Sequence, residues 1–318
     1  MLRETRALNV STENILVTRG SQMALTLVSR ALFRPGDTVV VEDPGYPHAW
    51  EAFKASGAAL VPIRVTAEGL DVSTLARLTK RSHVRAVYVT PHHQLPTTAT
   101  LSSDRRRELI ALARTHRFAI LEDDYDHEFH FDRDPIAPLA SIDPSLVVYI
   151  GTFSKVLAPG VRIGYLAAPA NVVEQLGAYR QALDLQGDPA MEAALAELIE
   201  HDELQRHIRR VKRVYRDRRD VLVELLERSL GNTVNFGVPA GGIGLWARTA
   251  PDINVEDWAA AAYRRGAAFL TARAFTLDRR LLPFIRLGYA CLNEDELRQA
   301  VSRMAAALPE VRPTRSSA

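Results

Sequence analysis

The stretch LVVYIGTFSKVLAPGVRIGY (146–165) decides the fold expected for this chain. It begins with a wholly apolar run, LVVYI (146–150), followed by hydroxyl side chains, a lysine, a Pro-Gly turn and an arginine. A strand that is apolar throughout is buried on both faces, which is typical of a parallel sheet covered by helices. We expect Lys155 to be half-buried at the end of this strand, where a charged amine is costly unless the chemistry of a site uses it.

Other strand patterns of this kind surround it and alternate with helical patterns. The strands are predicted at 14–18, 38–42, 58–65, 84–90, 118–122 and 163–168, and the helices at 24–32, 49–56, 71–81 and 102–116. This alternation predicts an α/β fold with a mostly parallel central sheet. In such sheets ligands bind beyond the carboxyl ends of the strands.

The rest of the chain has a different pattern. A long helical periodicity covers 191–229, with an interruption expected near His201-Asp202. Smaller α+β elements follow, with strands at 233–238, 243–248 and 284–289 and helices at 255–266 and 294–307. We therefore predict a large ligand-binding domain at 1–190, a connecting helix at 191–229, a small domain at 230–310 and a disordered tail at 311–318.

The composition excludes several classes of protein. The 40 Lys and Arg residues nearly balance the 38 Asp and Glu residues, so the charge recommends neither nucleic acid nor an anionic membrane as a partner. Neither a secretory signal nor an apolar run of membrane-spanning length is present. Cys291 is the single cysteine, so the chain cannot form an internal disulfide, and a reducing cytoplasm is expected.

Polar groups gather after the predicted strands. The first strand is followed by Gly20 and Ser21 at the start of a helix, which suits an anion such as phosphate. Together the strand ends provide such an anion nest, an aromatic side chain, a carboxylate, a phenol and an amine, from Gly20, Ser21, Thr152, Ser154, Arg162, Tyr46, Asp123, Tyr125 and Lys155. One ligand uses all of these groups: pyridoxal 5′-phosphate, whose aldehyde bonds a lysine and whose ring nitrogen needs an acidic partner.

The motifs also resemble a known family. GTFSK…PGVRIGY resembles the lysine segment of fold-type I pyridoxal-phosphate enzymes of aminotransferase class I/II. More narrowly, VEDPGYP, TPHHQ, EDDYDHEF and RHIRRVKRVYRDRRD look like the aminotransferase-like domain of MocR-type transcription regulators. The resemblance covers nearly the whole chain.

The resemblance implies a role for each matching position. Lys155 would form the Schiff base, Asp123 would pair with the ring nitrogen, Tyr125 would hydrogen-bond the ring hydroxyl and Tyr46 would stack on the ring. Arg286 would clamp the substrate carboxylate. The phosphate would be held by Ser21, Gln22, Thr152, Ser154 and Arg162.

The sequence departs from the family pattern in two places. LPTT (95–98) stands where the family has Asn-Pro-Thr-Gly, so His93 or Gln94 would replace the asparagine contact to the ring. The resemblance also implies an N-terminal arm and, in MocR-type regulators, a winged helix-turn-helix. Neither precedes the first strand, so we expect this chain to be a piece of a longer protein that meets nucleic acid only through the part outside it.

Some motifs have a simpler interpretation. The acidic and histidine-rich run at 126–132 matches no compact zinc spacing, so a surface loop is predicted there rather than a metal site. His92 is interpreted as a loop residue. The basic run at 207–220 is interleaved with apolar residues at helical spacing, which favours a solvated amphipathic helix over a nucleic-acid interface.

Two functions are compatible with these residues. The first is a transaminase that processes an amino acid and a 2-keto acid, as a homodimer. The second is an effector-sensing domain of a regulator, in which the same site binds the cofactor and an amino-acid-like effector and the outcome is a domain movement.

Overall fold

The computed structural model describes residues 1–132 and 134–311. An eight-stranded sheet has the order β1-β8-β7-β6-β5-β2-β3-β4. Its strands are β1 (Ile15–Thr18), β2 (Thr38–Asp43), β3 (Ala59–Thr66), β4 (Gly69–Leu70), β5 (Val84–Val89), β6 (Ala119–Asp124), β7 (Val147–Thr152) and β8 (Gly164–Ala167). Strands β3, β2, β5, β6 and β7 are parallel, and β4, β8 and β1 join by antiparallel pairs. The mostly parallel α/β sheet is thus confirmed.

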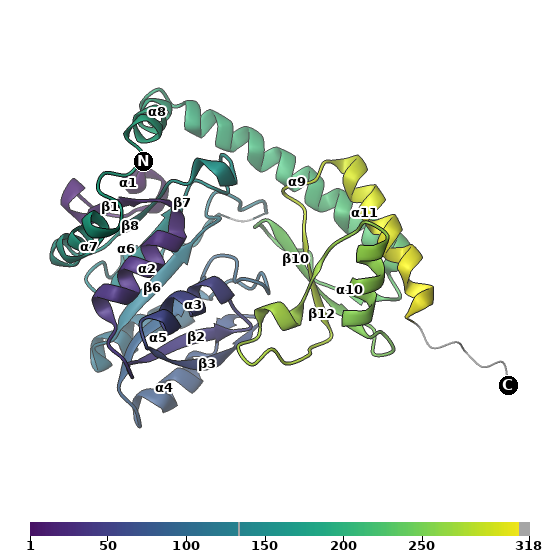
Figure 1. The fold of residues 1–318 in the computed structure, drawn as a ribbon, viewed down its shortest axis with the longest axis horizontal. Helices are drawn as coiled ribbons and strands as arrows, with labels where there is room; N and C mark the ends of the chain where they lie inside the picture. Colours follow the sequence, from purple (N-terminus) through teal and green to yellow (C-terminus); the bar gives the residue numbers. More distant parts are fainter. Residues whose placement is uncertain (133, 312–318) are drawn as a thin grey trace.

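Helices cover both faces of this sheet (Figure 1). One apolar cluster packs the sheet against α2 (Gly20–Leu32), α3 (Pro47–Ala55) and α7 (Ala170–Leu183). The other cluster packs the opposite face against α1 (Leu2–Arg6), α4 (Val72–Thr79), α5 (Ser103–His116) and α6 (Leu139–Ile142). The sequence patterns did not predict α1, α6 or α7. In α7 only Leu176 is buried, so it lacks the apolar stripe that reveals a helix.

Strand β8 lies between two neighbours and aligns them. Gly164 is opposite Thr18 of β1 on one side and opposite Thr152 of β7 on the other. A Cβ atom on Gly164 would lie 2.7 Å from the carbonyl carbon of Gly20. Glycine here lets the exits of β1 and β7 approach each other, and both exits lead into the predicted anion nest.

The second sheet is smaller and has four strands. Its order is β11-β12-β10-β9, with β9 (Val234–Asn235), β10 (Gly244–Thr249), β11 (Leu270–Thr271) and β12 (Phe284–Gly288). The helices α10 (Val255–Arg264) and α11 (Glu294–Ala307) pack on it. The predicted strand 233–238 is shorter than expected, since Gly237 and Pro239 follow it closely. Short 3-10 turns occupy Thr12–Asn14, Pro159–Val161, Ala272–Phe275 and Leu308–Glu310.

Helices α8 (Pro189–Glu200) and α9 (Glu203–Leu230) occupy the long helical region predicted at 191–229, and the expected interruption near His201-Asp202 is confirmed. The chain breaks at His201-Asp202, where Asp202 has a φ of 58°. Helix α9 reaches from α8 to α11 in Figure 1. Its early residues Leu204 and Ile208 belong to the core of the large sheet, and Leu222 and Leu226 belong to the core of the small sheet.

None of the helices within the described residues is long and apolar enough to cross a membrane. The predicted disordered tail, 311–318, lies outside the described residues except for Val311.

Candidate active site

The exits of β1 and β7 and the start of β8 build a cradle around the start of α2. Gly20 has a φ of +74°, and a Cβ atom there would lie 3.0 to 3.2 Å from the guanidinium of Arg162. The absence of that Cβ lets the Arg162 side chain pack over the first turn of α2, where its Nη2 donates to the carbonyl of Arg19 at 3.2 Å. Helix-start amides and a guanidinium together favour an anion.

A cavity of about 130 Å³ lies beside this cradle and gathers most of the predicted site residues. Ser21, Gln22, Tyr46, Asp123, Tyr125, Thr152, Ser154, Lys155 and Arg162 line it. Sequence reasoning missed two further lining residues, Thr90 and Leu95. Thr90 ends the predicted strand 84–90, so its position after a strand is the signal that could have identified it.

Lys155 differs from the expectation in its burial. Its neighbours Thr152 and Ser154 are buried, but Lys155 itself is exposed. The predicted half-burial is therefore wrong. In the turn after β7 the Ser154 amide donates to Thr152 Oγ1 at 3.2 Å, and the next residue, Lys155, lines the cavity as an exposed side chain at its rim.

Asp123 lies at the end of β6 and is buried. Tyr88 of β5 donates a hydrogen bond to its Oδ2 at 2.7 Å, and its Oδ1 has no partner among the described residues. Burial raises the pKa of Asp123 to about 7, although the Tyr88 hydrogen bond and the Lys155 charge oppose the rise. Strand alternation predicts correctly that Asp123 and Tyr125 face this cavity while Glu122 and Asp124 face away.

The two tyrosines differ in their surroundings. Burial raises the pKa of Tyr46 to about 12 and that of Tyr125 well above its usual value, so both are phenols at neutral pH. The Tyr125 hydroxyl donates to the carbonyl of His93 at 2.7 Å.

His93 and Gln94 lie outside the lining of the cavity. The His93 Nδ1 lies 3.0 Å from Asp126 Oδ1. The Gln94 amide nitrogen donates to Glu42, Pro44 and Leu95, which uses its donors within the loop. Neither side chain thus stands where the asparagine contact was expected.

Arg286 lies on β12, opposite Trp246 of β10, and does not line the cavity either. Within residues 1–132 and 134–311 no hydrogen bond or ion pair occupies its guanidinium. It is near enough to Tyr125 for its charge to offset part of the burial effect on the pKa of that phenol. A half-buried, unpaired guanidinium is suited to an anionic group.

The histidine-rich segment corrects another expectation. Asp126, His127 and His130 are buried, so this part of 126–132 is not a surface loop. Phe129 enters the core, and His130 forms an antiparallel bridge with Gly241 next to the small sheet. The segment packs between the two sheets, which its local sequence cannot reveal.

The donors around the cavity fit pyridoxal 5′-phosphate. The free Oδ1 of Asp123 and the unpartnered hydroxyl of Ser154 are buried polar atoms that lack a hydrogen bond in the described residues. Such atoms are destabilising unless a ligand or water satisfies them. A ring nitrogen can satisfy the carboxylate and a phosphate can satisfy the hydroxyl, and the Arg162 guanidinium packed over Gly20 suits the phosphate.

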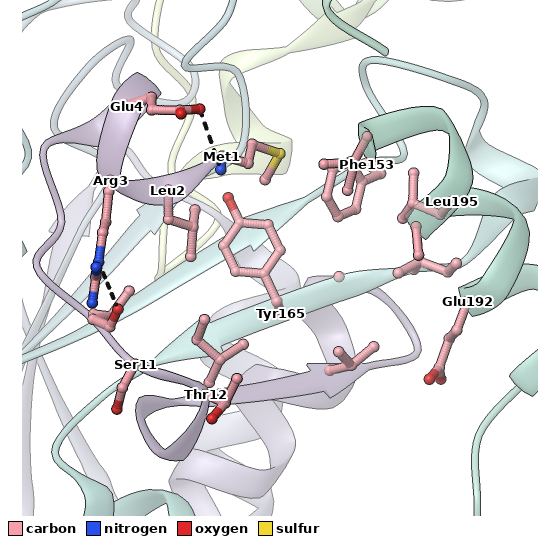
Figure 2. A pocket seen from close by; sticks show the side chains of 17 residues that line it. Met1, Leu2, Arg3, Glu4, Ser11, Thr12, Phe153, Tyr165, Glu192 and Leu195 are labelled. Atoms are coloured by element: carbon pink, nitrogen blue, oxygen red, sulfur yellow. Dashed lines mark hydrogen bonds and ion pairs between the residues drawn. The ribbon is translucent and has the colours of Figure 1, made fainter. Parts of the chain in front are cut away.

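A larger apolar cavity of about 680 Å³ lies elsewhere, between α1, β8 and α8. Figure 2 shows Leu2, Tyr165, Phe153 and Leu195 around it. It does not contain the convergent polar groups of the cradle, so the chemistry belongs to the smaller cavity.

Comparisons with known proteins agree with this geometry. The Aminotransferase class I and II family matches residues 2–304. Aromatic-amino-acid aminotransferase 1 of Thermococcus litoralis is 32% identical over 97% of this chain and 76% of its own length. The crystal structure of the multiple substrate aminotransferase of Thermococcus profundus has a TM-score of 0.90 at 30% identity, over 97% of this chain and 78% of that one.

A regulator is similar as well. The probable rhizopine catabolism regulatory protein MocR of Rhizobium meliloti is 30% identical over 96% of this chain, and the chain spans 62% of the regulator. The family match extends over nearly all described residues, and the fold agrees with that of solved aminotransferases. The chain therefore belongs to the aminotransferase class I and II family of fold-type I enzymes, which use pyridoxal phosphate as their cofactor.

Proposed function

We propose that the chain transfers the amino group of an amino acid to a 2-keto acid at the cavity beside α2. The observation that carries this proposal is that nine predicted side chains line one cavity, with Lys155 at its rim and the free Asp123 Oδ1 in its wall. When bound, pyridoxal phosphate supplies an electron sink that stabilises negative charge at the substrate α-carbon.

The residues of the chain have distinct tasks in this proposal. Lys155 would hold the cofactor through its aldehyde, and its amine would be the group that moves the proton of the substrate α-carbon. Asp123 holds a proton at the ring nitrogen, and the Tyr88 hydrogen bond keeps the carboxylate oriented. Tyr46 stacks on the ring and Tyr125 hydrogen-bonds its hydroxyl, while His93 acts behind Tyr125 through its carbonyl. Ser21, Gln22, Thr152, Ser154 and Arg162 hold the phosphate.

Replacement of Lys155 tests the core of the proposal. The protein with added pyridoxal phosphate is treated with borohydride, and the peptides are examined by mass spectrometry. We expect the cofactor on the peptide of Lys155 in the unaltered protein and on no peptide of Lys155→Ala. Lys155→Arg keeps the charge without the reactive amine and should also lack it. A reduced adduct on another lysine in both variants contradicts the assignment.

Arg286 is proposed to hold the substrate carboxylate. A charge-assisted pair of this kind contributes about 1.5–3 kcal/mol, which is roughly 10–100-fold in binding. Arg286→Ala should therefore lose the preference for an amino acid over the amine that lacks its carboxylate, measured by spectral titration of the bound cofactor. Arg248→Ala, an exposed arginine of the same sheet, is the control. An unchanged preference in Arg286→Ala places the carboxylate elsewhere.

A second candidate is the effector-sensing domain of a regulator, which the 30% identity to MocR supports. The two functions differ in turnover. An amino acid alone converts the bound cofactor to its amine form in a transaminase, whereas a sensing domain binds the amino acid and leaves the cofactor unconverted. Absorbance of the stoichiometric complex over time distinguishes the two.

The active protein is proposed to be a homodimer located in the cytoplasm. The region of α7 and α8 supports a dimer, because it exposes several large apolar side chains: Tyr179, Leu183, Leu185, Met191 and Leu198. Large apolar side chains exposed on consecutive elements are a feature that interfaces share. The lone, exposed Cys291 supports a reducing compartment, which cell fractionation tests.

A further inference from the structure

A cluster of three buried histidines and one carboxylate lies on the far side of β6 from Asp123. His92 follows β5, His127 and His130 follow β6, and one ligand atom from each histidine lies within 4.8 Å of the others. Asp124 is the carboxylate of this cluster. His92, His127, His130 and Asp124 are 1%, 5%, 7% and 3% exposed, so water does not solvate these polar groups freely.

The hydrogen bonds of His127 leave one of its ring nitrogens facing a carboxylate oxygen of Asp124 with no hydrogen between them. Its Nε2 lies 3.2 Å from the carbonyl oxygen of Thr5, so this nitrogen carries a hydrogen and donates it. In the neutral ring Nδ1 then bears a lone pair, and it lies 2.8 Å from Asp124 Oδ2. Tyr149 already donates to the same Oδ2 at 2.5 Å. Two acceptors thus face each other, and either a second proton or a metal ion has to join them.

The other two histidines point to the metal ion. Both ring nitrogens of His92 and the Nε2 of His130 are buried without a hydrogen-bond partner among the described residues. A proton on His127 satisfies none of these three atoms. Burial lowers the pKa of His92 well below its usual value and that of His130 to about 3, which leaves neutral imidazoles with lone pairs for coordination.

The spacing suits a tetrahedral ion. Two ligands of one zinc ion at 2.0–2.1 Å lie about 3.3 Å apart. His127 Nδ1 is 2.8 Å and His92 Nε2 is 3.6 Å from Asp124 Oδ2, so these two distances bracket the required value. The ligand nitrogens of the three histidines lie up to 4.8 Å from one another, so they must move slightly closer together to surround one ion.

We propose that His92, His127, His130 and Asp124 form a structural zinc site. Three imidazoles and a carboxylate complete a tetrahedron and leave no open position, as in structural rather than catalytic zinc sites. The Thr5 carbonyl fixes the tautomer of His127, and Tyr149 orients Asp124, which are the usual tasks of groups around a metal site.

The site also has a structural purpose. His127 contacts the N-terminal segment through Thr5, His92 belongs to the exit of β5, and His130 bridges to Gly241 beside the small sheet. An ion at this point links these segments directly behind the strand that carries Asp123. Its charge is partly offset by Asp124, while the nearby Arg6 is paired with Glu128.

The test measures metal content in the full chain after any histidine tag has been removed. Protein purified without chelators is analysed by inductively coupled plasma mass spectrometry, and we expect about one zinc ion per chain. Removal of zinc with dipicolinate should lower the melting temperature, and zinc chloride should restore it. His92→Gln and His130→Gln should each lose the zinc and this response. His83→Gln, an exposed histidine outside the cluster, should keep both.

A milder variant keeps the test decisive if a histidine variant does not fold. Tyr149→Phe retains all four ligands and removes the hydrogen bond to Asp124, so zinc affinity measured against a chromogenic chelator should fall about 10–100-fold. A zinc content below about 0.1 equivalent per chain, together with no change of melting temperature on addition of zinc, overturns the proposal. In that case a proton, and not a metal ion, joins His127 to Asp124. Zinc retained by both histidine variants, or unchanged affinity in Tyr149→Phe, overturns it as well.

Discussion

Two adjacent carboxylates, Asp123 and Asp124, belong to different sites because they follow one another in a strand. Asp123 points to the cavity with Tyr88, and Asp124 points to the histidine cluster with Tyr149. Alternation of side chains along β6 separates them, so one short segment serves both faces of the sheet. A change at either residue is therefore expected to have a distinct signature.

Asp123→Asn should change stability in opposite directions with and without cofactor. Because folding raises the pKa of Asp123 from 3.8 to about 7, its protonated form favours the folded state and its ionised form disfavours it. The stabilisation that the protonated Asp123 gives the folded state is complete at pH values below 3.8, the pKa in the unfolded chain, and is lost as the pH rises through about 7, the pKa in the folded chain. The cofactor-free asparagine variant should thus exceed the unaltered protein by on the order of a few kcal/mol near about pH 8, and by less near about pH 5.

Urea unfolding at both pH values measures this difference. With pyridoxal phosphate present the order should reverse, since only the carboxylate stabilises a protonated ring nitrogen. If the difference in stability between Asp123→Asn and the unaltered protein does not depend on pH, then folding does not raise the pKa of Asp123.

Local sequence patterns predicted which residues form the site more accurately than they predicted how deeply each residue is buried. The strand exits correctly placed Ser21, Asp123 and Ser154 around one cavity, because a parallel sheet brings these ends together. The exposure of Lys155 and the burial of His127 could not be predicted in this way. Both depend on how a loop packs against distant segments, and spacing along the chain carries no information on that packing.

Helix α9 is the element that both cores share. Its first turns pack with the large sheet and its last turns with the small sheet. The sequence predicted the extent of the helical region and its interruption near His201-Asp202, where Asp202 adopts a left-handed conformation that is uncommon outside glycine. The division lets α8 and α9 take different directions, and Figure 1 shows this change of direction.

Leu226→Ala should destabilise the chain by about 2–5 kcal/mol, because Leu226 is fully buried and truncation leaves a cavity. Val214→Ala changes a residue of the same helix that is 39% exposed, and should stay within about 0.5 kcal/mol. The free energy of unfolding from urea titrations compares the two. Equal effects would mean that the end of α9 contributes no core packing.

At the scale of the whole molecule, the loop at 272–283 joins the small domain to the edge of the active site. Arg280 pairs with the buried Asp43 at 2.7 Å, and the Gly45 amide donates to the Phe275 carbonyl at 2.9 Å. Tyr46 follows directly. The lining of the cavity is thus held in part by residues more than two hundred positions away, which explains why it requires the complete fold.

Dimer formation is expected to depend on the exposed face of α8. Leu198 is 38% exposed there, and Leu198→Glu should convert a dimer to a monomer, since a buried unpaired charge is strongly unfavourable. Leu281→Glu makes the same change at a residue that is 66% exposed and distant in sequence, and it should remain a dimer. Light scattering coupled to size-exclusion chromatography measures the mass. A monomeric unaltered protein, or a dimeric Leu198→Glu, contradicts this interface.

The position of β8 between β1 and β7 has a consequence for how the chain tolerates changes of length. A strand with partners on both sides cannot slip to absorb one added or missing residue. Such an indel exchanges the faces of the β8 side chains on one side of it and shifts their pairing with β1 and β7 by about 3.3 Å. Insertions within 164–167 should therefore abolish cofactor retention, whereas insertions in the exposed turn at 67–68 should be accepted, and an insertion scan would show this contrast.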